Sequence, residues 1–509
     1  MLNPYWIVQK ANICILNKKE ATSQVKEGRV QSFFLLSLLL KKQVPLQTSN
    51  ISDIMLHRYY KQNRHFYWSA FALAGPVIIS QLGHTLVQTA DTVIVGKFAG
   101  TIPLAAVSLV HSVFIVVLVI GLGISYGLTP LIAQANGQKN KENCGKLLSS
   151  SLWLNTMSAF VLFVVVNFGS MYALEHLDQD PFVVEAAKPY LLVLMFSIIP
   201  LMVFNTFKQF AEGLGFTRQA MNITIWGNVL NVILAIVFVK GMFGIEPMGI
   251  VGVGYATLID RVLMMLAMSF YVLRSKRFSS YTKTFSFFHA DLSRIRRIFK
   301  IGAPMAMQYV FEVGSFAAAS IIAGKIGAVE QASHQVAITM ASMTYMMASG
   351  IASAATIKTG HSYGQGNMLR VKKFATVSYH LVLIFMILCA LIFAIFNQYL
   401  PRIITDDLTV INISAQLLIV AGLFQLFDGI QVVGLGILRG MGDVNIPTLI
   451  TFVAYWIVGI PTAYLLGIHF QVGVQGVWYG LAIGLLTSSI LLFIRYRMII
   501  KERTERFDS

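Results

Sequence analysis

The sequence predicts an all-α integral membrane protein, with twelve transmembrane helices in two pseudo-symmetric six-helix bundles around a central cavity. The first observation is the composition: of 509 residues, 56% are hydrophobic and only 12% are charged, about half the roughly 25% usual in globular proteins. So few charges cannot cover a water-facing surface, whereas a lipid-facing surface needs almost none. The other two observations are twelve long apolar segments and an internal repeat.

Long apolar segments separated by short polar turns recur from Phe66 onward. Each holds about 20 to 28 residues, enough for a helix to cross a hydrocarbon core of about 30 Å. The predicted spans are 68–95, 104–130, 147–172, 188–207, 218–240 and 249–273 in the first half, and 298–323, 332–357, 374–396, 411–437, 445–467 and 474–496 in the second.

Basic residues concentrate on alternate loops. If the segment around Met55 is cytoplasmic, the cytoplasmic loops and the tail hold 26 Lys and Arg, and the outer loops hold five. This bias follows the positive-inside rule and predicts that both termini are cytoplasmic. The net charge of +17 then belongs to the face that meets anionic lipid, and it needs no nucleic-acid partner.

The two halves repeat each other at a nearly constant shift. The tetrapeptide LAGP at 73–76 recurs as IGAP at 301–304, a shift of 228, which also carries Gly96 onto Gly324. EGLG at 212–215 matches RGMG at 439–442, and GIVGVGY at 249–255 matches GVQGVWY at 473–479. Because each unit holds an even number of helices, a pseudo-two-fold axis along the membrane normal is expected, and two lobes about a central cavity are typical of a transporter.

The repeat and the spans together predict the domain boundaries. We expect an N-lobe at 55–275, a cytoplasmic linker at 276–297, a C-lobe at 298–500 and a cytoplasmic tail at 501–509. Residues 1–54 contain a single apolar run, at 33–40, which is too short to span a membrane. We interpret them as a disordered or non-native extension that precedes a natural start at Met55.

Four acidic residues fall inside predicted spans, where an unpaired charge costs several kcal/mol. They are Asp91, Asp260, Glu312 and Asp428, and Asp260 is followed directly by Arg261. Asp260 and Arg261 point about 100° apart on a helix, so a structural role with partners on neighbouring helices is the simpler interpretation for both. Glu312 and Asp428 have no basic residue within their predicted spans, so each must be protonated, hydrated or bound to a cation.

At these residues the sequence resembles the multidrug and toxic compound extrusion (MATE) family, in particular its NorM-like bacterial branch. The resemblance covers about residues 66–500. The motifs that carry it are VQTADTVIVG at 87–96, FEV at 311–313, ASHQVA at 332–337, DGIQVV at 428–433 and LRGMG at 438–442.

The resemblance implies a secondary active multidrug efflux transporter, which exchanges organic, often cationic compounds for Na+ or H+ by alternating access. It places the coupling cation at the acids Glu312 and Asp428, with Asp91 as a further acidic position. Na+ bound by Glu312 and Asp428 is the expected coupling ion and H+ is the alternative, and no other cofactor is expected. The DinF-like branch uses an Asn and an Asp four residues later, but Asn231 is followed by alanine at 235.

Polar, aromatic and methionine side chains within the spans are candidates for the substrate cavity, because methionine and aromatic surfaces adapt to many shapes. Packing against lipid or neighbouring helices is the competing interpretation for each. The candidates are Asn228, Asn231, Gln308, Gln335, Tyr345, Phe424, Phe427 and Trp456.

Other classes of function fit less well. A lipid-linked saccharide flippase of the same superfamily is the main alternative, but such proteins usually hold basic residues in the cavity. No Walker A motif, HExxH or CxxC occurs, so an ATP-driven pump and an enzyme are not expected. A channel stays open as an alternative function.

We expect a monomer in the bacterial inner membrane that contacts lipid and small-molecule drugs or toxic compounds.

Overall fold

The computed structural model describes residues 48–176 and 181–508. Residues 1–47, most of the predicted extension, lie outside this range, whereas residues 48–54 begin the first described helix. The chain divides at His65, and Phe66–Ser509 form one compact unit. The fold is described for this unit.

Every regular element in the described ranges is a helix, as the sequence predicts. The first half holds α3 (Thr48–Phe98), α4 (Thr101–Tyr126), α5 (Leu128–Gly137), α6 (Lys141–His176), α7 (Pro181–Phe196), α8 (Ile198–Gly213), α9 (Thr217–Lys240) and α10 (Gly249–Arg274). The second half holds α11 (Leu292–Ile326), α12 (Ala328–Gly364), α13 (Met368–Ile395), η1 (Pro401–Ile403), α14 (Leu408–Gly440), α15 (Asn445–Phe452), η2 (Val453–Gly459), α16 (Ile460–Tyr464), η3 (Leu465–His469) and α17 (Val474–Asp508).

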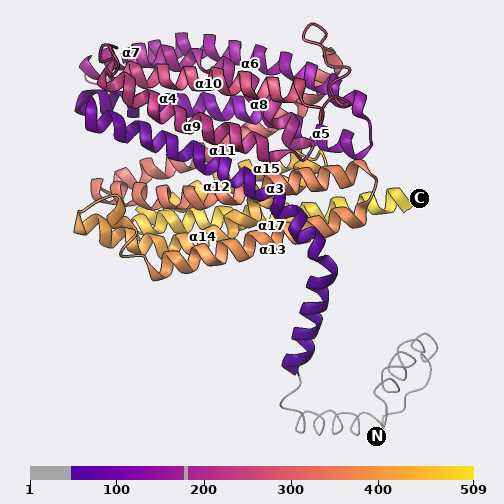
Figure 1. The fold of residues 1–509 in the computed structure, drawn as a ribbon. Helices are drawn as coiled ribbons and strands as arrows, with labels where there is room; N and C mark the ends of the chain where they lie inside the picture. The colour runs from indigo at the N-terminus through magenta and orange to yellow at the C-terminus, as the bar shows by residue number, and fades with distance from the viewer. Residues whose placement is uncertain (1–47, 177–180, 509) are drawn as a thin grey trace, which may run out of the picture. The chain divides into compact units, whose positions relative to one another are not determined.

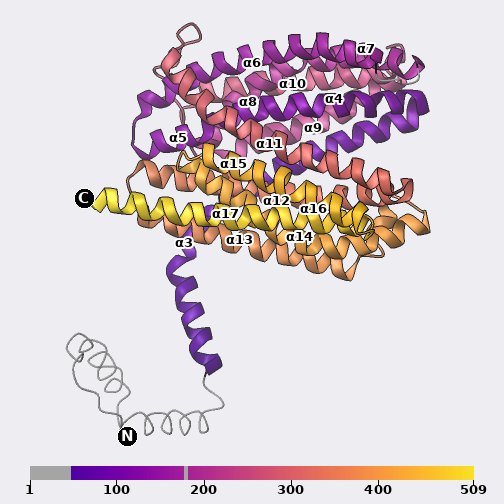
Figure 2. The same cartoon turned by 180° about the vertical axis from the view of Figure 1, so that it is seen from behind.

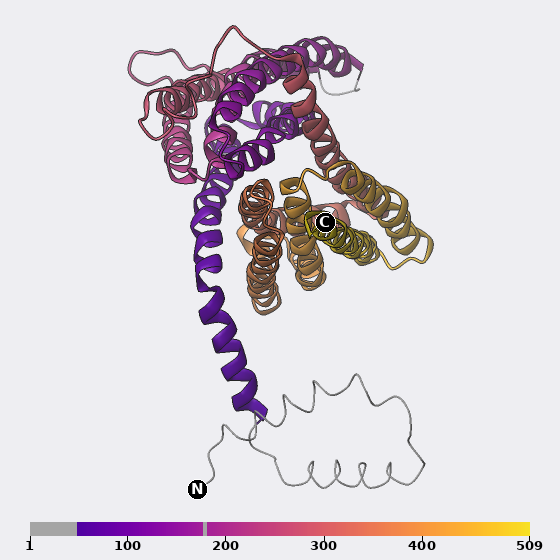
Figure 3. The same ribbon diagram turned by 90° about the vertical axis from the view of Figure 1, so that its right-hand side faces the viewer.

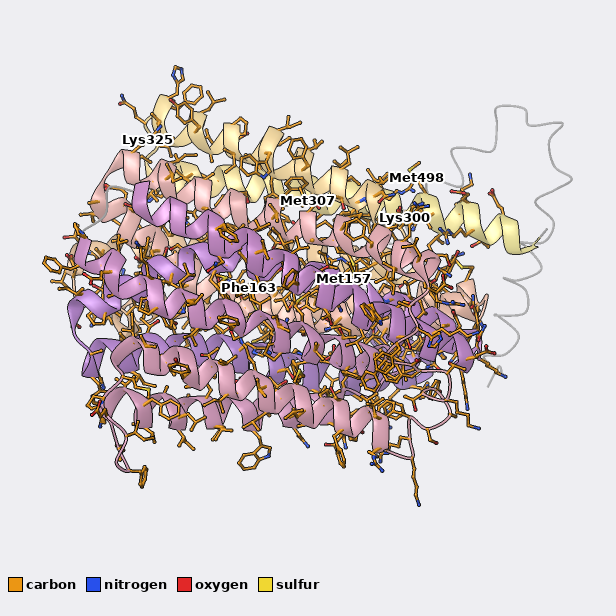
Figure 4. All side chains as sticks on the ribbon, turned by 90° about the horizontal axis from the view of Figure 1, so that it is seen from above. Met157, Phe163, Lys300, Met307, Lys325 and Met498 are labelled. Atoms are coloured by element: carbon orange, nitrogen blue, oxygen red, sulfur yellow. The ribbon has the colours of Figure 1, made fainter. Side chains whose placement is uncertain are left out.

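These elements form twelve segments that are long and apolar enough to cross a membrane within the described ranges, which confirms the predicted number. The second segment joins α4 to α5, the fourth joins α7 to α8, and the eleventh runs from Asn445 to His469 through two π-helical stretches. Large apolar side chains such as Met157 and Met498 point outward, as lipid-facing side chains must, and Lys300 and Lys325 lie near opposite ends of α11 (Figure 4).

The spans are arranged as two bundles, which we call the N-bundle (α3–α10) and the C-bundle (α11–α17). α4 and α6–α10 lie together on one side, and α12–α14 and α17 lie together on the other (Figure 1). Figure 2 shows α17 along the outside of the C-bundle, where it packs against α14. Figure 3 views both bundles from the end that carries the C-terminus.

The first helices of the two halves each cross to the other bundle. Leu73 and Ala74 of α3 belong to a buried cluster built otherwise from α12, α13, α14 and α17. Ile301 of α11 belongs to a cluster built otherwise mainly from α5, α6, α8 and α10. Since residue 73 corresponds to 301 and 74 to 302 in the repeat, the crossing is reciprocal. Farther along α3, the helix packs within its own N-bundle, where Gly83 lies against Asn228.

Close helix contacts join the two bundles at the end that carries the C-terminus. A Cβ on Gly302 would lie 2.5 Å from the carbonyl oxygen of Ile124, and a Cβ on Gly123 would lie 2.3 Å from the Cα of Ala306. Gly137 of α5 contacts His361 of α12 in the same way. Small residues allow such backbone approach between membrane helices. At the opposite end the clusters around Val95 and Ala319 stay within their own bundles, so the bundles are joined mainly at one end.

Candidate functional site

The C-bundle buries two of the predicted acids together. Glu312 of α11 is 5% exposed and Asp428 of α14 is 3% exposed, and their charges interact. The Tyr345 side chain, from α12, is hydrogen-bonded to Glu312. Asp428 Oδ1 is buried without a hydrogen-bond partner among the described residues. Two carboxylates with an unsatisfied oxygen can hold a proton or a hard cation, which prefers oxygen ligands.

Tyrosine and glutamine side chains surround this acid pair. Tyr455, in the π-helical stretch of the eleventh span, is within electrostatic range of both acids. Its hydroxyl donates to Gln431 Oε1 over 3.0 Å. A π-helical stretch often marks a functional position, and here it brings Tyr455 next to the acids.

The third predicted coupling residue, Asp91, lies in the other bundle. It is 5% exposed, and its charge interacts with Arg261 and Asp260 rather than with the C-bundle acids. Asp260 is 4% exposed. The Arg261 guanidinium donates to Ser197 Oγ over 2.6 Å and lies 5.4 Å from the centre of the Phe114 ring. The structure therefore separates the four predicted acids into two pairs, one in each bundle.

Glycines let the polar side chains of the N-bundle fit between helices. A Cβ on Gly227 would lie 2.5 Å from Asp260 Oδ1, and a Cβ on Gly83 would lie 2.5 Å from Asn228 Nδ2. Asn231 Nδ2 donates to Thr257 Oγ1 over 3.2 Å. Both asparagines are buried, so they belong to the interior of the N-bundle.

The other predicted cavity residues are spread over different surroundings. Gln308 is fully buried; it accepts from Arg439 and donates to Thr448 Oγ1 over 2.9 Å. Phe424 packs in a core cluster, 5.4 Å from the Trp478 ring, and Phe427 packs against the same cluster. Gln335 is exposed, and Trp456 is 39% exposed with its indole N–H on the carbonyl of Phe311. Of this set, Tyr345 interacts directly with the acid pair, through Glu312.

Three buried charges escaped the sequence prediction, which assigned them to loops. Lys208 and Glu212 of α8 are each 4% exposed, and Arg439 of α14 is 6% exposed. The prediction that only four acids lie inside the spans is therefore wrong, because α8 and α14 continue beyond the predicted ends of their apolar segments. No basic residue lies within the predicted spans of Glu312 and Asp428, but α14 continues far enough to include Arg439, and the Arg439 charge acts on Glu312.

Two of these missed residues, Glu212 and Arg439, lie near the contact between the bundles. The Arg439 guanidinium lies 5.3 Å from the Tyr309 ring, and the Tyr309 ring lies 5.9 Å from the Tyr126 ring of the N-bundle. Both Glu212 and Arg439 are within electrostatic range of Tyr126. Glu212 is the first residue of the repeated motif EGLG, and Arg439 is the first residue of its counterpart RGMG. The repeat itself was therefore the sequence signal that could have identified these two residues.

An apolar groove opens on the C-bundle away from the acids. Its volume is about 560 Å³. Its walls are Ala318, Ile321 and Ile322 of α11 and Ile460, Pro461, Tyr464 and Leu465 of the eleventh span. None of the predicted site residues lines it. Several of its residues are among the exposed apolar side chains, as expected of a surface that faces lipid.

Comparisons with known proteins agree with this architecture. The MatE family model matches residues 76–237 and 304–465, two segments related by the same shift of 228 as the repeat. The chain is 32% identical over 455 residues to the multidrug resistance protein MdtK of Edwardsiella ictaluri, covering 88% of this chain and 98% of that protein. It is 32% identical over 449 residues to the multidrug resistance protein NorM of Photobacterium profundum, covering 87% and 97%.

Solved structures show the same fold. The eukaryotic MATE transporter AtDTX14 superimposes with a TM-score of 0.79 at 19% identity, covering 87% of this chain and 99% of that one. A MATE protein in its bent conformation gives a TM-score of 0.80 at 20% identity, covering 87% and 97%. With its twelve spans, its duplicated halves and these relatives, the chain belongs to the MatE family of multi-pass membrane transporters, which are not enzymes.

Proposed function

We propose that the protein is a secondary active multidrug efflux transporter, which exports organic, often cationic compounds in exchange for Na+ or H+ by alternating access. The observation that carries the proposal is the buried pair Glu312 and Asp428 with the Tyr345 side chain on Glu312. A coupling cation and a cationic drug compete for the same negative charge. The relatives named multidrug resistance proteins support a drug substrate.

Alternating access requires that the two bundles separate at one end while they approach at the other. In this structure the bundles are joined where Gly123 and Gly302 pack across the contact. We place this end in the cytoplasm, with both termini and the connection between α10 and α11, because basic residues concentrate there. In this conformation, Glu312 and Asp428 then exchange ions with the side of the membrane that lies opposite the cytoplasm.

The finer assignments belong to the same proposal. We assign Na+ as the coupling ion, with H+ as the alternative, and a monomer in the bacterial inner membrane. The lobes are residues 55–275 and 298–500, with a linker at 276–297 and a tail at 501–509.

Drug efflux is tested by expression in a bacterium that lacks its own multidrug pumps. Wild-type protein is expected to raise resistance to ethidium and to fluoroquinolones. Glu312→Gln and Asp428→Asn are expected to abolish the resistance while the protein level in the membrane stays unchanged. Unchanged sensitivity across a broad panel of compounds would count against drug efflux, and full resistance with both variants would show that the acid pair is not the coupling site.

The coupling ion is tested in proteoliposomes with Na+ and H+ gradients imposed separately. A Na+-coupled transporter moves ethidium when only the Na+ gradient is present, and a H+-coupled one responds only to the pH gradient. Transport driven by neither gradient would reject antiport. The result also decides which cation Glu312 and Asp428 exchange.

A lipid-linked saccharide flippase is the second candidate, because Lys208 and Arg439 are buried bases of the kind that could hold a diphosphate. Their surroundings favour the first proposal. Arg439 donates to Gln308 Oε1 over 2.6 Å, and the Lys208 charge acts on Glu212 one helical turn away. Both bases are thus already engaged by groups of the protein. A flippase would move a fluorescent lipid-linked saccharide across the proteoliposome membrane, and we expect no such movement.

A further inference from the structure

The apolar groove of the C-bundle lies where two neighbouring spans part and meet again. α11 and the eleventh span touch at Trp456, whose ring would lie 3.1 Å from a Cβ on Gly314 and whose indole N–H donates to the Phe311 carbonyl oxygen over 3.1 Å. Near the far end of α11 they meet again, where a Cβ on Gly467 would lie 3.5 Å from Ile326 Cδ1. The groove, of about 560 Å³, lies between these two contacts. It therefore follows about 12 residues of α11, or about 18 Å.

The eleventh span is distorted along the groove. The short helix α16 lies between the π-helical stretches η2 and η3. A π-helical turn holds an extra residue, so the side chains that follow it leave the register of an α-helix. In the repeat this span corresponds to α9, since residues 217 and 445 are 228 apart, and α9 is an unbroken α-helix. The π-helical stretches therefore distinguish the second half from the first, and such stretches are frequent at functional sites.

The walls of the groove suit a hydrocarbon chain. Apart from Tyr464, every wall residue carries an aliphatic side chain. Ile321 and Leu465 are 63% and 47% exposed, so the groove is open toward the lipid. Its volume lies within the range of about 300–1,000 Å³ that is typical of small-molecule sites. No acidic residue stands in the walls, so they offer no charge that would hold an organic cation.

Lys325 stands one helical turn beyond Ile321 on the same face of α11. Residues four apart on a helix are neighbours on its surface, and Lys325 is exposed near the end of α11 (Figure 4). Among the described residues, no acid forms an ion pair with it. Lysines near the ends of membrane helices extend toward the lipid headgroups. The ammonium group of Lys325 is therefore placed to attract the phosphate of an anionic lipid.

We propose that the groove binds one acyl chain of an anionic phospholipid, whose headgroup phosphate contacts Lys325. The lysine would repel an organic cation, whereas a phospholipid matches both the apolar walls and the positive charge. The site lies between α11, which carries Glu312, and the eleventh span, which carries Tyr455. A bound chain thus contacts both elements and stabilises their separation. Lipid binding at this site depends on neither the drug nor the coupling ion.

The experiment counts bound lipids on purified, delipidated full-length protein by native mass spectrometry. Dioleoylphosphatidylglycerol and dioleoylphosphatidylcholine are added separately at increasing concentrations. Wild-type protein is expected to bind about one phosphatidylglycerol about five-fold more tightly than phosphatidylcholine, because one lysine contacts an anionic headgroup. Lys325→Gln should remove this preference and leave phosphatidylcholine binding unchanged. Ile321→Trp, and Leu465→Trp as a second variant, fill the groove and should abolish binding of both lipids.

The repeat supplies matched controls on α3. Val93 and Lys97 are both exposed and stand 228 residues before Ile321 and Lys325. Val93→Trp and Lys97→Gln are therefore expected to leave lipid binding unchanged. Equal effects of each control and its counterpart in the groove would overturn the proposal, and so would undiminished lipid binding in both groove variants.

A third ligand distinguishes a lipid site from a drug site. Tetraphenylphosphonium, an apolar organic cation, is expected to bind equally to wild-type protein and Ile321→Trp. If wild-type protein retained no phospholipid and Ile321→Trp lost tetraphenylphosphonium, the groove would be a drug site and the proposal would be wrong. Thermal unfolding shows whether each variant is folded. Because no transport is measured, the outcome is separate from that of the drug-efflux test.

Discussion

Tyr345 and Tyr455 surround the same acid pair but use their hydroxyl groups differently. The Tyr345 side chain is hydrogen-bonded to Glu312, whereas the Tyr455 hydroxyl donates to Gln431. Both tyrosines lie near the acids. Comparing variants of Tyr345 and Tyr455 therefore separates the effect of a direct contact with Glu312 from the effect of a nearby tyrosine hydroxyl.

Tyr345→Phe is expected to change the apparent affinity for the coupling cation about 10-fold or more. A hydrogen bond to a charged group contributes about 1.5–3 kcal/mol, and each 1.4 kcal/mol is a factor of about ten in affinity. The measurement is the cation concentration that gives half-maximal ethidium transport in proteoliposomes. Tyr455→Phe is the control and should change it much less. Equal effects would mean that the Tyr345 contact has no special part in ion binding.

Gly227 is expected to be intolerant of a side chain because α9 meets Asp260 there. In Gly227→Ala the new Cβ would lie 2.5 Å from Asp260 Oδ1 and 2.6 Å from Met264 Cγ. We expect a loss of stability of about 1–3 kcal/mol, seen as earlier thermal unfolding in detergent. Gly75→Ala is the matched control, since nothing lies within 4 Å of its Cβ position, and alanine favours a helix. Equal unfolding temperatures for both variants would contradict the close packing.

At the level of single residues, the sequence predicted Glu312, Asp428, Asp91 and Asp260 as buried charges because each interrupts an apolar run. It could not predict their pairing, since the partner of each acid lies on a helix distant in the chain. Lys208, Glu212 and Arg439 were missed because a charged residue at the edge of an apolar run looks like the start of a loop. Packing against other helices, which buries them, leaves no local pattern.

Among the elements, the contact between α4 and α11 determines how the bundles meet. Gly302→Ala would place a Cβ 2.5 Å from the Ile124 carbonyl oxygen, a backbone atom that cannot move aside alone. We expect this variant to shift the population toward conformers in which the bundles are apart at this end. Gly422→Ala is the control, because its Cβ would make ordinary contacts of 3.5 Å with Ala390 inside the C-bundle.

The shift is measured as a distance between spin labels on Lys139→Cys, at the end of α5, and Leu369→Cys, at the start of α13, in a protein without its native cysteines. Both positions are exposed. The distance distribution should extend to longer values in Gly302→Ala and stay unchanged in Gly422→Ala. An unchanged distribution in both would show that this contact does not control the closure.

The number of the spans was predictable, because twenty apolar residues in a row have few alternatives to a membrane helix. Their lengths were underestimated, since helices such as α8 and α14 run beyond the apolar segments. The interruptions of the spans were not predictable. The breaks at Gly127 and Ser197 and the π-helical stretches in the eleventh span depend on tertiary contacts. Ser197 shows why: its hydroxyl binds both the Leu194 carbonyl oxygen and Arg261, which lies 64 residues away.

For the molecule as a whole, the positive-inside rule predicts which face is cytoplasmic. Phe243 in the connection between α9 and α10 is 88% exposed, and Lys283 between α10 and α11 is exposed. In intact cells a membrane-impermeant maleimide is expected to label Phe243→Cys, and to label Lys283→Cys only after permeabilisation. The reverse pattern would invert the proposed orientation.

The reciprocal crossing of α3 and α11 has a consequence for the origin of the chain. In each half the first helix is buried in part against the other half, through Leu73 and Ala74 in one case and Ile301 in the other. A single six-helix ancestor would have lacked that surface and would have left an apolar helix face without a partner. Such an ancestor would have functioned as a homodimer of parallel subunits that exchanged their first helices. Fusion of two copies of the gene would have joined an existing pair, and only afterwards could the two halves diverge.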